Sequence, residues 1–248
     1  MRLATMENSL IRIGNQTCVH VPANLPFEFA LNHGFTAFAW LSDRGHTGGW
    51  GADSDTQTRL HLRRTALDHN IAFSVHAPFG ANPATTAGAT AIRRSIEFAA
   101  DVGARIVNFH LFCESPADEF AEAVGTVLDD ARKAGVVLTL ENTPMTSPDH
   151  FNAVFDALAT MPAAVGRVGM CLDSGHANLH AETRNDYIRF IDRLGDHVPI
   201  VHWHAHENWG DRDNHLTLFT GPAGRDSTGL RALIERLLDR GFCGSIIP

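Results

Sequence analysis

Residues Val136–Asn142 read VVLTLEN, an almost continuous apolar run that ends in two polar residues. Runs that are apolar on both faces are typical of strands in a parallel sheet covered by helices, so we expect a strand at Val136–Glu141. Helical patterns stand on either side, at Ala117–Ala134, where Ser115-Pro116 suits an N-cap and a first-turn proline, and at Pro148–Ala159. Alternating strands and helices predict parallel βαβ units. The stretch is therefore one repeating unit of an α/β fold.

The same alternation runs along the whole chain. Seven further strands are expected, at Leu10–Thr17, Phe35–Leu41, Ile71–His76, Arg105–Leu111, Arg167–Asp173, Pro199–His204 and Cys243–Ile247. Five further helices are expected, at Leu25–His33, Thr56–His69, Thr90–Val102, Thr183–Leu194 and Ser227–Arg240. Eight strands in 248 residues leave about 31 residues for each unit, and the total is close to the roughly 250 residues of a typical (β/α)8 barrel. We therefore predict an α/β fold with a single TIM-barrel domain over residues 1–248, whose eighth helix is missing or truncated because the sequence stops at the eighth strand.

The composition is that of a globular protein, with 44% hydrophobic residues, 19% charged residues and a net charge of −8. The acidic balance and the lack of a basic run argue against nucleic acid as a partner. No apolar run approaches the ~20 residues that a membrane span needs, and Met1–Gly14 lacks the pattern of a secretory signal. Four widely spaced cysteines are expected to be reduced core residues of a cytoplasmic protein: Cys18, Cys113, Cys171 and Cys243.

A polar side chain of a metal-ligating type ends each of five consecutive predicted strands. These residues are His76, His110, Glu141, Asp173 and His204, and the intervals between them are 34, 31, 32 and 31 residues. Each interval is one βα unit. Because the carboxyl ends of all strands in a parallel barrel open on the same face, where active sites of this fold are built, the five side chains are expected to converge at one mouth.

Two further groups follow these strands. His176 comes three residues after Asp173, and Asp213 and His215 form an Asp-x-His pair in the loop after the seventh strand. Mixed histidine and carboxylate ligands suit zinc, manganese or similar divalent ions better than calcium or magnesium. A single histidine or acid at a strand end is more often a structural group or a helix cap, so the prediction of a metal site rests on the set as a whole.

The His-rich end of the seventh strand leaves one choice open. His202 and His206 alternate with His204, and the two-residue period of a strand places all three on the same face. Spacing alone does not decide which of them binds a metal.

Four segments resemble the xylose-isomerase-like TIM-barrel superfamily, which includes sugar isomerases, sugar epimerases and the apurinic-site endonuclease IV enzymes. They are Val75–Pro78 (VHAP), Leu140–Thr143 (LENT), Leu172–His176 (LDSGH) and the stretch His204–Gly224 with its Asp-Asn-His triplet. The resemblance runs from the third strand to the end of the chain, about two thirds of the sequence. It implies the same barrel that the strand pattern predicts.

The resemblance also implies roles for individual residues. Glu141, Asp173 and His204 match three of the four ligands of the isomerase-type metal. Among the three alternating histidines the resemblance selects His204, because the family's His-x-x-Asp-Asn pattern aligns there, with Glu207 in place of the aspartate. The remaining candidates match further ligands of the trinuclear zinc site in the endonuclease branch: His76, His110, His176, Asp213 and His215. The fourth isomerase ligand would be a glutamate at position 249, one residue beyond Pro248, so either the chain is truncated or that ligand is lacking.

The favoured function is a metal-dependent isomerase or epimerase of a small sugar or a related hydroxy-carbonyl compound. Proton transfer would pass through a metal-stabilised ene-diolate, with Glu141 taking the proton next to the carbonyl. His176 would donate to a substrate oxygen, and Arg212 could take the same role from its loop. The cofactor would be one to three divalent ions (Mn, Zn, Co or Mg), and the sequence leaves the oligomeric state open, a homo-oligomer included.

Two alternatives stay open. The first is an endonuclease IV-like zinc phosphodiesterase acting on abasic DNA, which is supported because eight of the nine cluster ligand positions are filled. Two observations weigh against it: Leu111-Phe112 stands where that branch has Pro-Gly, and the acidic net charge does not favour DNA binding. A barrel that binds a metal or a sugar without turnover is suggested by the missing carboxylate at the end of the eighth strand.

Overall fold

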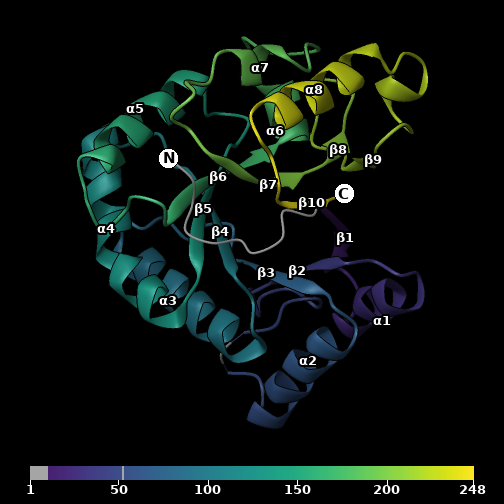
Figure 1. Ribbon diagram of the computed structural model, residues 1–248, viewed down its shortest axis with the longest axis vertical. Helices are drawn as coiled ribbons and strands as arrows, with labels where there is room; N and C mark the ends of the chain where they lie inside the picture. The colour runs from purple at the N-terminus through teal and green to yellow at the C-terminus, as the bar shows by residue number, and fades with distance from the viewer. Residues whose placement is uncertain (1–10, 52) are drawn as a thin grey trace.

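The computed structural model describes residues 11–51 and 53–248, and its central feature is a closed barrel of eight parallel strands (Figure 1). The strands are Arg12–Gln16 (β1), Ala37–Leu41 (β2), Ala72–His76 (β3), Ile106–His110 (β4), Val137–Glu141 (β5), Val168–Asp173 (β6), Ile200–His204 (β7) and Ser245–Ile247 (β10). They follow one another around the barrel in chain order, and β10 pairs with β1 to close it. Each strand lies inside its predicted range. Leu10 and most of Met1–Gly14, on which the expectation about a secretory signal rests, lie outside the described residues.

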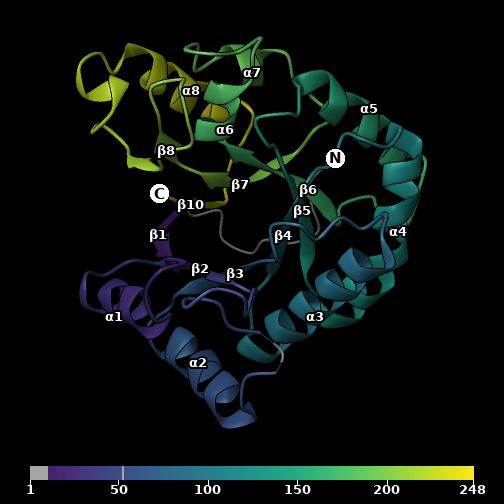
Figure 2. The same ribbon diagram turned by 180° about the vertical axis from the view of Figure 1, so that it is seen from behind.

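Helices cover the outside of the barrel, as Figures 1 and 2 show from opposite sides. They are Asn24–Asn32 (α1), Thr56–Asp68 (α2), Thr86–Val102 (α3), Ala117–Ala134 (α4), Pro148–Ala159 (α5), Ser174–Leu179 (α6), Arg189–Asp192 (α7) and Thr228–Asp239 (α8). The bounds of α4 and α5 agree with the prediction. α3 begins earlier than the predicted Thr90 because Thr85 caps it, accepting a hydrogen bond from the backbone N–H of Gly88.

The predicted cap of α4 is wrong. Pro116, not Ser115, occupies the N-cap position, and no side chain caps the helix. Asp118 and Glu119 lie in the first turn instead, where carboxylates interact favourably with the positive end of the helix dipole. At the other end, Gly135 terminates the helix with a φ of 70°, a conformation that glycine adopts at little cost.

The connection between β6 and β7 departs most from the prediction. The expected single helix over Thr183–Leu194 is wrong: α6 follows β6 directly, and only the short α7 falls in the predicted range. Asp173 starts α6, since its carboxylate accepts a hydrogen bond from the backbone N–H of His176. Asn185 prevents one continuous helix in this connection, because its φ of 59° is left-handed. Its backbone N–H donates to the side chain of Asn178.

The last connection also differs from a simple helix. After β7 the chain forms a short antiparallel pair, His206–Glu207 (β8) with Leu216–Thr217 (β9), and a 3-10 turn, Pro222–Gly224 (η1), before α8. The described residues thus contain eight α-helices because two of them lie between β6 and β7. The last described element is β10.

Alternate residues of the barrel strands have different surroundings, as the two-residue period requires. Large apolar side chains such as Phe38, Trp40, Phe109, Leu140 and Trp203 belong to the main hydrophobic core with the helices. The alternating set is small or polar: Ala37, Ala39, Ser74, Asn108, Thr139, Cys171, His202 and Ser245, all of them buried. Barrel interiors are usually filled by branched apolar residues. This interior is polar, and the outer layer supplies most of the apolar core.

One irregularity sets the direction of the histidines in β7. Met170 pairs with Ile200, but the next residue, Cys171, pairs with His202, so Val201 is an extra residue in β7. Such bulges re-aim side chains and are common beside active sites. As a result His202 lies opposite Cys171, and His204 lies opposite Asp173.

The outer core predicts how stability responds to truncation. Phe98 on α3 is fully buried, whereas Leu67 on α2 is 75% exposed. We expect Phe98→Ala to lower the free energy of unfolding by about 3–5 kcal/mol because it leaves a cavity, and Leu67→Ala to change it by less than about 0.5 kcal/mol. Urea denaturation measures both variants. Equal effects of the two would contradict this assignment of the core.

Candidate active site

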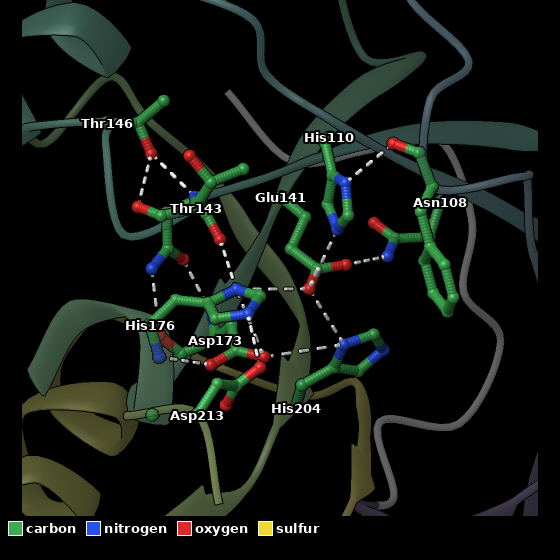
Figure 3. Close-up of polar contacts among 12 residues, drawn as sticks. Asn108, His110, Glu141, Thr143, Thr146, Asp173, His176, His204 and Asp213 are labelled. Atoms are coloured by element: carbon green, nitrogen blue, oxygen red, sulfur yellow. Dashed lines mark hydrogen bonds and ion pairs between the residues drawn. The ribbon is translucent and has the colours of Figure 1, made fainter. Parts of the chain in front are cut away.

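The carboxyl ends of β3 to β7 bring four side chains together around a fifth, Glu141. His76 Nε2 lies 3.1 Å from Glu141 Oε2, and His204 Nδ1 lies 3.2 Å from Glu141 Oε1. His110 Nε2 is 3.7 Å from the same carboxylate. Asp173 stands beside His204, 3.9 Å from its Nδ1. The predicted convergence of the strand ends is therefore present in the structure, and Figure 3 shows Glu141 between His110 and His204.

Glu141 is only 2% exposed, so its charge needs close partners. Besides the histidines, the side-chain amide of Asn108 donates a hydrogen bond to Glu141 Oε2, and Thr139 in turn donates to Asn108 Oδ1 at 2.8 Å. Burial alone would raise the pKa of Glu141, but the charges and hydrogen bonds of His204 and His76 outweigh it and hold this pKa well below its usual value. Glu141 is therefore a carboxylate near neutral pH.

Asp173 is the second buried acid of the cluster. Its Oδ2 lies 2.9 Å from His206 Nε2 and 3.5 Å from His176 Nδ1. Asn142 fixes the end of the strand by accepting from the backbone N–H of Asp173 at 2.7 Å and donating to its carbonyl at 2.8 Å. Burial raises the pKa of Asp173, but His176 and His206 lower it by more, so this group is also ionised.

The third group joins α6 to the loop after β8. Asp213 Oδ2 lies 3.3 Å from His176 Nε2 and 3.0 Å from His215 Nε2. Burial opposes the charged form of His176, but Asp173 and Asp213 outweigh it and raise the pKa of His176 to about 10. Hydrogen bonds from His176 and His215 lower the pKa of Asp213 despite its partial burial. His206 stacks on His215 with ring centroids 3.9 Å apart.

Three overlapping sets of ligand atoms result. Each set has its atoms within 4.8 Å of one another: His76, His110 and Glu141; Glu141, Asp173 and His176; and His176, Asp213 and His215. The sets share Glu141 and His176, so they form one continuous cluster rather than separate sites. Protonated His176 offsets part of the charge of the three carboxylates in this arrangement, and a bound cation would take over that role.

An aromatic side chain borders the cluster. Phe79, in the loop after β3, is 43% exposed, and its ring packs against His110 with centroids 6.1 Å apart at an interplanar angle of 15°. The carbonyl of Phe79 also lies 3.0 Å from His110 Nδ1. An exposed ring of this kind offers an apolar surface beside the polar ligands.

A family model described as xylose isomerase-like TIM barrel matches residues 27–248. The chain belongs to the xylose isomerase-like TIM-barrel family. This membership confirms the resemblance drawn from the strand-end motifs.

Known proteins with this fold include sugar epimerases. A crystal structure of a D-tagatose 3-epimerase-like protein superposes with a TM-score of 0.73 at 21% identity, covering 96% of this chain and 90% of that one. The TTHB071 protein from Thermus thermophilus, soaked with ZnCl2, gives a TM-score of 0.66 at 23% identity, with coverages of 96% and 91%. Among curated proteins, the uncharacterized protein MJ1311 of Methanocaldococcus jannaschii is 23% identical over 95% of this chain and 82% of its own length. At these identities the similarity is one of fold.

Two site residues of this xylose isomerase-like barrel were not identified from the sequence: Asn108, which donates to the carboxylate of Glu141, and Asn142, which bonds to the backbone of Asp173. His206, which the sequence left open as a metal ligand, contacts Asp173 directly. The Glu-Asn pair at the end of β5 was a usable signal for Asn142. Asn108 had no such signal, because an asparagine within a strand is more often a simple interior residue.

Arg212 takes a different position from the rest of the predicted set. Its side chain is exposed, and its Nε donates to Asn214 at 2.8 Å. No contact between Arg212 and the carboxylate cluster is present among the described residues, so a role for this residue stays a prediction. Of the four cysteines expected to be core residues, only Cys171 is buried; Cys113 and Cys243 are partly buried, and Cys18 is exposed. All four are free, as expected. None of the described helices is long and apolar enough to cross a membrane.

Glu207 is an anchor for the loop that follows the cluster. It is 1% exposed and accepts hydrogen bonds from the backbone N–H groups of Gly221 at 3.1 Å and Ala223 at 2.8 Å. The hydroxyl of Tyr187 donates to it at 2.8 Å. Asp213 lies in the loop between β8 and β9. These contacts join the end of β8, where that loop begins, to Gly221 and Ala223, which follow β9. Glu207 is thus occupied by hydrogen bonds in this barrel.

The anchoring role can be tested with Glu207→Gln. We expect the free energy of unfolding to fall by about 1–3 kcal/mol, because a neutral amide no longer satisfies three buried donors, and the amides of Gly221 and Ala223 to exchange faster with deuterium. Glu235→Gln on the exposed face of α8 is the control and should change neither quantity. Unaltered exchange at Gly221 and Ala223 in Glu207→Gln would show that the loop does not depend on this anchor.

Proposed function

We propose that this protein is a divalent-metal-dependent isomerase or epimerase of a small sugar or a related hydroxy-carbonyl compound. The observation that carries the proposal is Glu141: an ionised, buried carboxylate oriented by Asn108 and His76 at the carboxyl end of the barrel. A base of this kind suits removal of a proton from carbon next to a carbonyl group. The solved sugar epimerases that share this fold support the same class of reaction.

The residues present fit a divalent cation. The donors are carboxylate oxygens and imidazole nitrogens, and His204 Nδ1 faces both Glu141 and Asp173. One buried ring nitrogen beside them, His206 Nδ1, has no hydrogen-bond partner among the described residues. Glu141, Asp173 and His204 would hold the cation, with zinc, manganese or cobalt favoured by the mixed donor set. When bound, it would supply Lewis-acid polarisation of the substrate's carbonyl and neighbouring hydroxyl oxygens.

The chain's own groups would then move the proton. Glu141 accepts it from the carbon next to the carbonyl, and Asn108 and His76 keep the carboxylate oriented. For an isomerase, Glu141 can return the proton to the neighbouring carbon. For an epimerase, a second acid must deliver a proton from the other face; His176 carries one at neutral pH and lies 3.6 Å from Glu141. Phe79 would cover an apolar face of the sugar.

Phosphodiester hydrolysis at abasic DNA is the second candidate. It is favoured by a specific observation: the sets His76–His110–Glu141 and His176–Asp213–His215 are both complete, and the endonuclease branch uses such additional ligands. A cluster of ions can activate water and clamp a phosphate. The net charge of −8 weighs against DNA as a substrate.

Replacement of the base tests the proposed reaction. We expect Glu141→Gln to lower turnover of the best substrate in a panel of aldoses and ketoses by about 10²–10⁴-fold. The readout is deuterium incorporation from heavy water at the carbon next to the carbonyl. Glu97→Gln on the exposed face of α3 should retain full exchange. Full exchange by Glu141→Gln would remove Glu141 as the base.

Metal removal separates the two candidates. A chelated, dialysed sample is expected to lose sugar turnover and to regain it with Mn²⁺, Co²⁺ or Zn²⁺. The same samples are incubated with duplex DNA that contains one abasic site, and strand cleavage is followed on a denaturing gel. Zinc-dependent cleavage with no sugar turnover would support the phosphodiesterase instead. Metal binding with neither activity would support a binding barrel.

A further inference from the structure

Below the cluster, the polar interior of the barrel contains a fourth set of ligand atoms, of which the proposed reaction uses only His204. Cys171 on β6 and His202 and His204 on β7 each offer one ligand atom, and these atoms lie within 4.8 Å of one another. Cys171 and His202 are direct neighbours across the two strands because of the bulge at Val201. The set therefore combines one strand-end residue, His204, with two residues that this bulge brings together.

The hydrogen-bonding capacity of the His202 side chain is unsatisfied among the described residues. This side chain is fully buried, and neither of its ring nitrogens has a hydrogen-bond partner among the described residues. His204 adds a third such atom, since its Nδ1 faces Glu141 at 3.2 Å while its Nε2 is unpartnered. Buried polar atoms are almost always satisfied, so three unpartnered nitrogens next to a buried thiol require a missing partner.

The donor set agrees with a cation as this partner. Cys171 and His202 are both fully buried inside the barrel. The ligand atoms of Cys171, His202 and His204 lie within 4.8 Å of one another, so one ion could contact all three. Cysteine sulfur and imidazole nitrogen are both common metal ligands in proteins.

We propose that Cys171, His202 and His204 form a buried site for a thiophilic cation, Zn²⁺ or Cu(I), separate from the cation held by the carboxylates. A thiolate with two imidazoles selects these ions over Mg²⁺, Ca²⁺ or Mn²⁺. Three protein ligands satisfy Cu(I), whereas Zn²⁺ takes a fourth ligand such as water. His204 would link the two sites, with Nδ1 toward Glu141 and Nε2 toward the interior. Proton transfer by Glu141 does not require this second ion, so the inference goes beyond the proposed function.

The test is X-ray absorption spectroscopy on the full-length protein, loaded either with Zn²⁺ or, anaerobically, with Cu(I). We expect a sulfur scatterer at about 2.3 Å from the metal in wild type. Cys171→Ser should lose the sulfur signal and about one equivalent of bound metal by elemental analysis. Cys113→Ser, which removes a thiol outside the set, should retain both. The ion that shows the sulfur scatterer identifies the occupant.

Two outcomes would overturn the proposal. One is a wild-type spectrum with only nitrogen and oxygen scatterers for both ions, which would leave a buried water as the partner of His202. The other is an equal metal content and sulfur signal in wild type and Cys171→Ser. If Cys171→Ser does not fold, the presence or absence of the sulfur scatterer in the wild-type spectrum still tests the proposal. His202→Gln is then the second variant and should also lose about one equivalent of bound metal. Sugar turnover is not a readout, so failure of the proposed function leaves this result unaffected.

Discussion

The buried carboxylate of Glu141 is the interaction on which the rest of the site depends. A charge in this position is strongly unfavourable unless hydrogen bonds and opposite charges surround it. Asn108 donates to it, Thr139 orients Asn108, and the imidazoles of His76 and His204 contact it from β3 and β7. Side chains from four strands therefore surround one carboxylate.

The barrel makes this arrangement stable by separating its two packing surfaces. Phenylalanine, tryptophan and leucine side chains fill the layer between the strands and the helices, where apolar burial contributes most of the stability. The interior can then hold serine, asparagine, threonine, cysteine and histidine side chains without loss of the main core. The bulge at Val201 extends this polar interior by placing His202 opposite Cys171.

The connections after β6 and β8 complete the site. Asp173 serves both as a member of the cluster and as the cap of α6, which carries His176 to within 3.3 Å of Asp213. Glu207 keeps the following loop in place through the amides of Gly221 and Ala223. The two carboxylates therefore have different roles. Asp173 contacts and orients histidines, whereas Glu207 accepts hydrogen bonds from backbone N–H groups and is structural.

Apolar runs with a period of one βα unit were enough to predict the barrel and the place of each strand, because they leave few other parallel arrangements. They also predicted the convergence of the strand-end residues His76, His110, Glu141, Asp173 and His204. The sequence did not determine the shape of the connections: Thr183–Leu194 has helical composition, but the left-handed Asn185 interrupts it, and the backbone N–H of Asn185 donates to the side chain of Asn178. Nor could it separate the roles of His202, His204 and His206, which share one alternation pattern. The three roles depend on contacts between strands that are distant in the sequence. A one-residue bulge and the neighbouring strands leave His202 facing a thiol, His204 facing Glu141 and His206 facing Asp173.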